Sequence, residues 1–140
     1  MPVALEIVSP ERLVLSRPVD MVVIPGSEGD MGVLEGHTPM IVLLRGGVIA
    51  LYQDDQVTDR LFVAGGFAEV TPDRCTVLAI EAVPVAELRR EEGERRLQEA
   101  EADLAKIESS DVMAEELALE RAQSARALVE AAEELLTGSH

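Results

Sequence analysis

The sequence is poor in aromatic side chains and almost without cysteine. Aromatic residues make up 2% of the 140 residues, tryptophan is absent, and Cys75 is the single cysteine. With so few rings, a hydrophobic core must be built from Val, Ile, Leu and Ala. An apolar fraction of 47% still predicts a folded chain. This length allows one sizeable core, or a smaller core with an appendage.

Basic side chains are also scarce. Twelve Lys and Arg stand against 27 Asp and Glu, which gives a net charge of −15. No basic surface is available to neutralise phosphates, which argues against a nucleic-acid partner. The same shortage argues against adsorption to an anionic membrane.

Long apolar runs are missing as well. A run such as MIVLL (40–44) falls far short of the roughly 20 residues that span a bilayer, so we expect no direct membrane insertion. The first residues, MPVALEIVSP, lack the basic start and apolar run of a signal peptide. Cys75 has no partner for an internal disulfide, which fits a reducing compartment. We expect a soluble, cytoplasmic chain.

The chain changes character at Pro84. Before it, short runs rich in Val and Ile are separated by turn residues such as Gly46-Gly47, Asp54-Asp55 and Gly65-Gly66. The runs are VALEIV (3–8), RLVLS (12–16), VDMVVI (19–24), MIVLL (40–44), VIALY (48–52), RLFVA (60–64), FAEV (67–70) and CTVLAIEAV (75–83). Such closely spaced turns, with no helical stretch between the runs, predict an antiparallel β-sandwich or barrel over residues 1–84.

Residues 85–140 predict an antiparallel hairpin of two helices. Glu, Arg, Ala and Leu dominate residues 86–108, and SerSerAsp (109–111) offers capping side chains before a second helix that runs to about 136. Two stripes have helical spacing: Leu97, Ala100, Leu104 and Ile107, then Ala118, Ala122, Ala125, Val129, Ala132 and Leu136. Because alanine buries little apolar area, the hairpin fits either a stable appendage or an element that detaches.

The segment GSEGDMGVLEGHTP (26–39) looks like a site. It lacks the lysine and the following helix of a phosphate-binding loop, and its Glu28 and Asp30 would repel an anion. His37 lies near carboxylates, but no nucleophile or set of metal ligands accompanies it, since Cys75 sits in an alternating strand and His140 is the last residue. We therefore expect no catalytic site and no metal site. Exposed apolar residues beside the acids favour a protein contact surface instead.

Two blocks resemble the epsilon subunit of bacterial and chloroplast F-type ATP synthases. The first is VIPGSEGDMGVLEGHTPMIVLLRGGVI (23–49), with the family's spaced glycines, its Gly-His-[AT]-Pro and a basic residue before glycine. The second, FVAGGFAEVTPDRCTVLAIEA (62–82), resembles the family's GG-x-x-E-V-x-x-x-x-V-T-V-L-A segment and matches it at Gly65, Gly66, Glu69, Val70, Val77, Leu78 and Ala79. The resemblance covers essentially the whole chain. One departure is Glu35, which stands where the family usually has proline.

The resemblance implies a non-catalytic subunit of the rotor, at the foot of the central stalk. Its sandwich would bind the gamma shaft and the c-ring, on the cytoplasmic face of the bacterial inner membrane. The residues expected to face these partners are Glu28, Asp30, Met31, Leu34 and His37. The hairpin would lie against the sandwich or extend towards the alpha/beta catalytic head, where some members inhibit ATP hydrolysis. Only Arg121 and Arg126 are basic in the second helix, so we expect weak inhibition or none.

Some members of this family also bind ATP through an [IL]-D-x-x-R-A motif. The corresponding stretch here, VAELRR (85–90), keeps Arg89 but lacks the aspartate and the alanine. Arg89, Arg121 and Arg126 are the candidate nucleotide contacts, yet the broken motif argues against ATP as a cofactor. The alternative functions are a stand-alone acidic adaptor or an ATP-sensing module, and a small hydrolase that uses His37.

Overall fold

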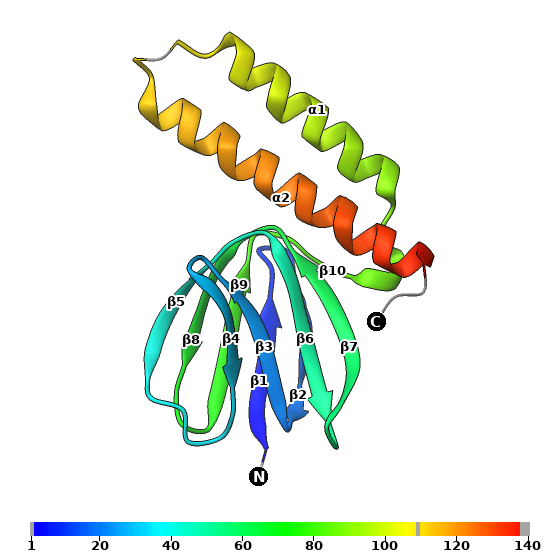
Figure 1. The fold of residues 1–140 in the computed structure, drawn as a ribbon. Coiled ribbons are helices and arrows are strands. Elements are labelled where there is room, and N and C mark those ends of the chain that lie inside the picture. The colour runs from blue at the N-terminus through cyan, green and yellow to red at the C-terminus, as the bar shows by residue number, and fades with distance from the viewer. Residues whose placement is uncertain (1, 109, 138–140) are drawn as a thin grey trace.

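The protein consists of a β-sandwich with a helical hairpin at one end (Figure 1). The structure, a computed structural model, describes residues 2–108 and 110–137, with the side chains of the last helix described as far as Glu134. The strands are β1 Val3–Val8, β2 Leu13–Val19, β3 Met21–Gly26, β4 Gly29–Val33, β5 Met40–Leu44, β6 Gly47–Gln53, β7 Gln56–Val63, β8 Gly66–Val70, β9 Arg74–Ala79 and β10 Ala82–Pro84. A short 3₁₀ helix (Val85–Glu87) then leads into α1 (Arg90–Lys106) and α2 (Val112–Thr137). The predicted fold class is confirmed.

The strands form two layers that meet at one corner. One layer has the order β10-β7-β6-β3, with β4 beside β3, and the other has the order β5-β8-β9-β1-β2. The described register joins the layers through a single pair between β3 and β5, Gly26 opposite Leu44. All pairings are antiparallel except that of β1 with β9.

The core lies between the two layers and is almost entirely aliphatic, as the composition predicts. Alternate residues of each strand point inward, for example Val3, Leu5 and Ile7 of β1, all at most 1% exposed. Cys75 is part of this core, and burial raises the pKa of its thiol to about 11. This position agrees with the alternating strand in which the sequence places Cys75.

Two boundaries differ from the sequence prediction. The glycine-rich segment 26–39, which is not among the runs expected to be strands, contains β4, which pairs with β3 from Val22 opposite Val33 to Gly26 opposite Gly29. The sequence did not predict this strand, because glycine is normally depleted in strands and the segment is rich in glycine. The run 75–83, expected to be one strand, divides into β9 and β10 at residues 80–81, where the chain leaves one layer and joins β7 in the other.

The two helices pack along the alanine stripe that the sequence predicted. Ala118, Ala122, Ala125 and Ala132 are at most 2% exposed, while the side chain of Leu136 lies outside the described part. Gly93 of α1 fits against this stripe: an added Cβ would lie 2.7 Å from Val129 Cγ2. Asp111 caps α2, accepting a bond of 3.1 Å from the N–H of Ala114.

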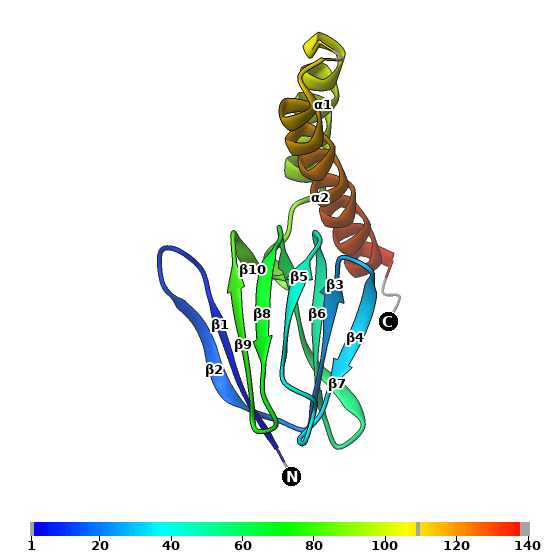
Figure 2. The same ribbon diagram turned by 90° about the vertical axis from the view of Figure 1, so that its left-hand side faces the viewer.

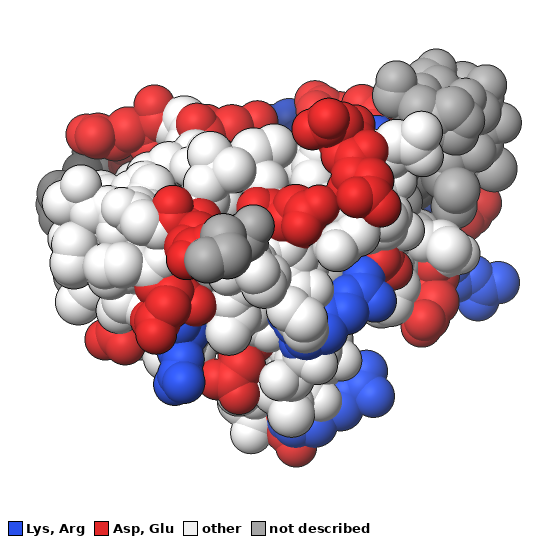
Figure 3. All heavy atoms as spheres, turned by 90° about the horizontal axis from the view of Figure 1, so that it is seen from below, with Lys and Arg blue, Asp and Glu red and all other residues white. Residues whose placement is uncertain are grey.

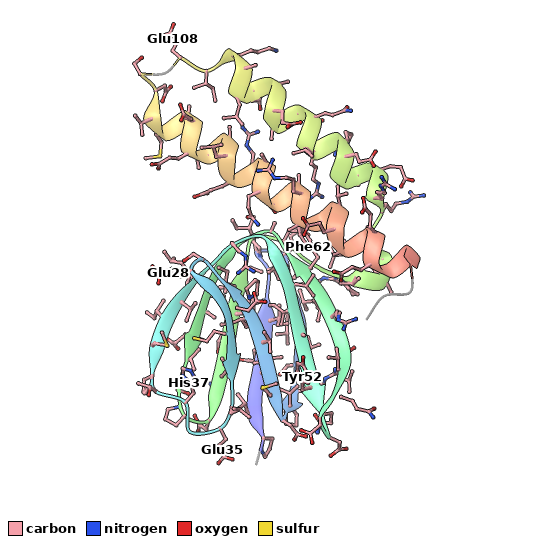
Figure 4. The ribbon with its side chains drawn as sticks, in the orientation of Figure 1. Glu28, Glu35, His37, Tyr52, Phe62 and Glu108 are labelled. Atoms are coloured by element: carbon pink, nitrogen blue, oxygen red, sulfur yellow. The ribbon has the colours of Figure 1, made fainter. Side chains whose placement is uncertain are left out.

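The hairpin is fixed to the sandwich where α2 crosses the start of β6. The Gly46 N–H donates to Gln123 Oε1 at 2.9 Å, and Gln123 Nε2 donates to the Gly46 carbonyl at 2.7 Å. A Cβ on Gly46 would lie 2.5 Å from Ser124 Cα, so only glycine allows this approach. Nearby, Phe62 on the outer side of β7 is fully buried beneath the hairpin (Figure 4). Beyond this contact the hairpin projects away from the sandwich (Figure 2).

An ion-pair network joins α1 to the sandwich. Both guanidinium branches of Arg96 donate to the carboxylate of Glu81, at 2.6 and 3.0 Å, and Arg96 Nε donates to Glu92 at 3.0 Å. Hydrogen bonds from Arg95 and Arg96 lower the pKa of Glu92 below its usual range. The stability that Glu92 gains from these bonds is therefore fully present at pH values above the ordinary pKa of a glutamate. It is lost as the pH falls through the lowered pKa of Glu92.

We expect Gly46→Ala to loosen the hairpin without disturbing the sandwich core. The new methyl group must displace α2, and overpacking of this kind costs about 1–3 kcal/mol. Urea unfolding followed by circular dichroism gives the loss of stability, and hydrogen exchange of α1 and α2 locates it. Gly32→Ala is the matched control, because its Cβ would meet only Met21 Sδ at an ordinary 3.6 Å. A Gly46→Ala protein with unchanged hairpin protection would contradict this account of the contact.

We expect Arg96→Lys to weaken the attachment of α1. Lysine keeps the charge but loses the two-pronged bond to Glu81, which should lower the free energy of unfolding by about 0.5–1.5 kcal/mol. Arg95→Lys is the control, since Arg95 pairs only with Glu92 and Glu99 of its own helix among the described residues. Equal effects of the two substitutions in urea unfolding would show that the contact between Arg96 and Glu81 adds nothing to the free energy of unfolding.

Candidate partner-binding surfaces

The residues of segment 26–39 that were expected to form a protein contact surface are divided between the two ends of the sandwich. Glu28 lies in the β3–β4 turn, at the end that carries the hairpin, whereas Glu35 and His37 lie at the opposite end (Figure 4). Met31 lies between them on β4, half-buried and packed against the core. The five residues expected to face partners therefore do not form one surface.

The β3–β4 turn (26–30) is held by Arg45. Arg45 Nη1 donates to the Gly26 carbonyl at 2.5 Å, and Nη2 donates to Asp30 at 2.7 Å. A Cβ on Gly26 would lie 2.6 Å from the Gly29 carbonyl, so glycine is needed for the tight turn. Glu28 is exposed at its tip and has no hydrogen bond or ion pair within the part of the chain that the structure describes. The turn is rigid and presents a free carboxylate.

The opposite loop, residues 34–39, is tied to the β8–β9 turn. The Gly36 N–H donates to the Pro72 carbonyl at 2.6 Å, and Gly36 has a φ of +85°, which favours glycine. His37 Nδ1 lies 2.8 Å from the carbonyl of Thr38, and none of the described carboxylates pairs with the ring. Leu34 is 54% exposed beside it.

Neither end of the sandwich has the arrangement of a catalytic or metal centre. No group of three or more His, Cys, Asp or Glu in the described residues is placed to hold a metal ion. His37 lacks both a nucleophile and an orienting carboxylate among those residues, which an acid–base site would need. No described helix is long and apolar enough to cross a membrane.

An exposed apolar surface covers the outer side of β5, β8 and β9, and the sequence reasoning missed it. Leu43 stands opposite Phe67, and Phe67 stands opposite Leu78, so the three side chains form a row across the strands. We call this surface the β5–β8–β9 face and define it by Ile41 (67% exposed), Leu43 (67%), Phe67 (40%), Leu78 (40%) and Ile80 (68%). The sequence feature that could have indicated this face is the unbroken run MIVLL, which supplies apolar residues to both sides of an antiparallel sheet.

Gly65 and Gly66 set the position of this face. Their φ angles are +130° and +131°, a region that side-chain-bearing residues rarely adopt. A Cβ on Gly66 would lie 2.1 Å from the Leu78 carbonyl. The glycine pair therefore allows β8 to approach β9 closely and brings Phe67 beside Leu78.

The candidate nucleotide contacts are dispersed over the hairpin. Arg121 pairs with Asp103 at 3.0 Å and lines a hollow together with Arg96. Arg89, exposed at the start of α1, lines a different hollow with Glu91, Glu92 and Arg95. Arg126 is exposed on α2 and lines neither of these two hollows.

Seen from the end of the sandwich opposite the hairpin, acidic side chains are spread over the surface, and basic side chains appear at several separate places (Figure 3). This distribution accords with the net charge of −15.

Comparison with known proteins identifies relatives along almost the whole chain. The family model described as "ATP synthase, Delta/Epsilon chain, beta-sandwich domain" matches residues 2–85. The ATP synthase epsilon chain of Granulibacter bethesdensis is 64% identical over 129 residues, which cover 92% of this chain and 96% of that protein. That of Gluconacetobacter diazotrophicus is 50% identical over 132 residues, 94% of each chain.

Solved structures agree with this match. A chain in the Euglena gracilis mitochondrial ATP synthase assembly of OSCP, F1 and c-ring has a TM-score of 0.74 and 26% identity, covering 93% of this chain and 81% of its own length. A chain from the central stalk and c-ring of the Tetrahymena thermophila enzyme shares the fold, with a TM-score of 0.63 at 12% identity over 94% of this chain and 97% of its own. The protein belongs to the ATP synthase delta/epsilon-chain family and is an accessory subunit, not a catalytic one.

Proposed function

We propose that the protein joins the shaft of the ATP synthase to its membrane ring as part of the central stalk. The β5–β8–β9 face binds the gamma subunit, and the β3–β4 turn contacts the c-ring, at the cytoplasmic side of a bacterial membrane. The observation that carries the proposal is the exposed row Leu43–Phe67–Leu78 on a chain of this family. The Euglena relative, found in an assembly with F1 and c-ring, supports the same reading.

The apolar face suits a stable protein contact. Its large side chains are exposed on adjacent strands, whereas soluble proteins seldom leave contiguous apolar surface uncovered. The loop with Leu34 and His37 continues this face at the lower end of β5, because Gly36 is bonded to the β8–β9 turn. Leu34 and His37 therefore belong with the shaft contact in this proposal.

The β3–β4 turn suits a second, separate partner. It lies at the corner where the two layers meet and carries the free carboxylate of Glu28, with Asp30 fixed by Arg45. A rigid acidic turn favours a polar loop with a basic side chain, since complementary charge orients the contact. We assign this turn, with Glu28 and Asp30, to the ring.

The mechanism is mechanical coupling without chemistry. A protein that binds the shaft through one surface and the ring through another makes the shaft and the ring rotate together. The close-packed aliphatic core keeps the two surfaces at a fixed angle, because packed interiors deform little. Matches to epsilon chains along most of the sequence leave no observation that favours a stand-alone adaptor.

Single substitutions should separate the two contacts. We expect Leu43→Ser to weaken binding to a complex of head and gamma depleted of this subunit by about tenfold or more, since fully burying a leucine side chain is worth about 1.5–3 kcal/mol. Glu28→Lys should leave that affinity unchanged but reduce ATP-driven proton pumping in reconstituted membranes. Both residues are exposed, so each variant is the folding control for the other.

Failure of the unaltered chain to bind the head–gamma complex would reject the stalk assignment itself. Equal loss of affinity in both variants would reject the division into two surfaces.

We expect the full chain to slow ATP hydrolysis by the head–gamma complex by less than about half. An extended hairpin would have to hold the acidic segments of the head with Arg121 and Arg126, and exposed ion pairs contribute only about 0–1 kcal/mol each. Arg121 would also have to leave Asp103. Steady-state hydrolysis with saturating chain, compared with an Arg126→Gln protein, is the measurement. Strong inhibition that Arg126→Gln relieves would mean that the hairpin is a brake.

A further inference from the structure

A groove runs beneath α2 where the helix leaves the sandwich. On one side of the helix it is a hollow of about 620 Å³, lined among others by Leu43, Phe67 and Ile80 of the sandwich and by Leu119 of α2. On the other side is a hollow of about 480 Å³, whose walls include Leu117 and Ala125. Ala64, Ile80 and Glu120 line both hollows, so the two adjoin, and we call them together the groove.

We infer that the shaft subunit, once bound to the β5–β8–β9 face, also fills this groove and so holds the hairpin against the sandwich. The occupant is an apolar segment of that subunit with a basic side chain. This inference rests on the proposed function, because it extends the proposed shaft contact onto α2. Shaft binding and hairpin docking are then one linked equilibrium.

Continuity of the surface carries the first step. Leu43, Phe67 and Ile80 belong to the β5–β8–β9 face and also form the sandwich wall of the groove. A partner that covers these side chains reaches the edge of α2, where Leu119 is 46% exposed and Leu117 is 53% exposed. Covering the whole apolar surface therefore requires contact with both parts of the chain.

Charge determines the chemistry of the occupant. The cations that line the groove are all engaged: Arg45 with Asp30, Arg96 with Glu81, and Arg121 with Asp103. Glu120 has no ion pair within the described residues and lies on the rim of both hollows. The groove offers a free carboxylate beside leucine and isoleucine side chains, which fits a Lys or Arg flanked by apolar residues.

The direct contacts between hairpin and sandwich explain why a bridging partner matters. Among the described residues they include the hydrogen bonds between Gly46 and Gln123, the ion pair between Arg96 and Glu81, and the burial of Phe62 beneath the hairpin. A segment that touches the sandwich and Leu119 together gains affinity only in the docked state. A ligand that binds one state better shifts the equilibrium towards it, and docking must strengthen the binding by the same factor.

The test uses the full-length chain and the head–gamma complex depleted of this subunit. Hydrogen exchange of residues 121–134 is measured before and after binding, together with the affinity. We expect binding to slow exchange in this segment at least about tenfold, and Leu119→Ser to remove that protection and lower the affinity about three- to tenfold. Met113→Ser is the matched control, since Met113 lies on α2, is 66% exposed, and lines neither hollow.

Glu120→Gln tests the charge in the same assay. We expect its affinity to fall about threefold at low salt and to match the unaltered chain at high salt, because an exposed pair is screened. Glu116→Gln, on the same helix but outside the groove, should have no effect.

The outcomes separate this inference from the proposed function. If the unaltered chain does not bind, the proposed function fails. If it binds but residues 121–134 exchange as fast as before or faster, or if Leu119→Ser and Met113→Ser bind equally well, only the groove inference is overturned.

Discussion

The approach of α2 to Gly46 is the constraint on which the arrangement of the two parts depends. At this point the backbone of α2 lies so close to Gly46, the residue before β6, that a single methyl group on Gly46 would not fit. The side chain of the neighbouring Arg45 bonds to Gly26 and Asp30 and so holds the β3–β4 turn. Two adjacent residues thus fix the hairpin and the acidic turn relative to the same corner of the sandwich.

The sequence was sufficient for the fold because its periodicities are clear. Alternation before Pro84 and the alanine stripe after it correspond to the sandwich and the hairpin. It was insufficient for β4, because Gly29 and Gly32 occupy strand positions that glycine rarely takes. The break at residues 80–81 was missed for a different reason: a strand that changes layers keeps its apolar pattern on both sides of the crossing.

Interfaces were harder to predict than the fold. The glycine-rich segment drew attention to Glu28 and His37, yet β4 separates them to opposite ends of the sandwich. The apolar face went unseen because exposure depends on which strands end up adjacent, and Leu43, Phe67 and Leu78 come from three separate runs. Likewise, the bonds between Gly46 and Gln123 join residues 77 positions apart, a separation over which no local pattern operates.

The corner between the layers has a consequence for stiffness. Gly26 and Leu44 are the one pair across it in the described register, flanked by backbone hydrogen bonds from Ser27 N–H to the Leu43 carbonyl (2.8 Å) and from Arg45 N–H to the Pro25 carbonyl (3.0 Å). So few backbone hydrogen bonds carry little load from one layer to the other. A twisting force applied to β5 therefore reaches the other layer largely through the packed aliphatic side chains, together with the guanidinium of Arg45, which spans the corner, and residues 45–46, which connect β5 to β6. The sandwich therefore resists twisting as a filled solid does, and a cavity in its interior would make it more compliant even where every strand stayed paired.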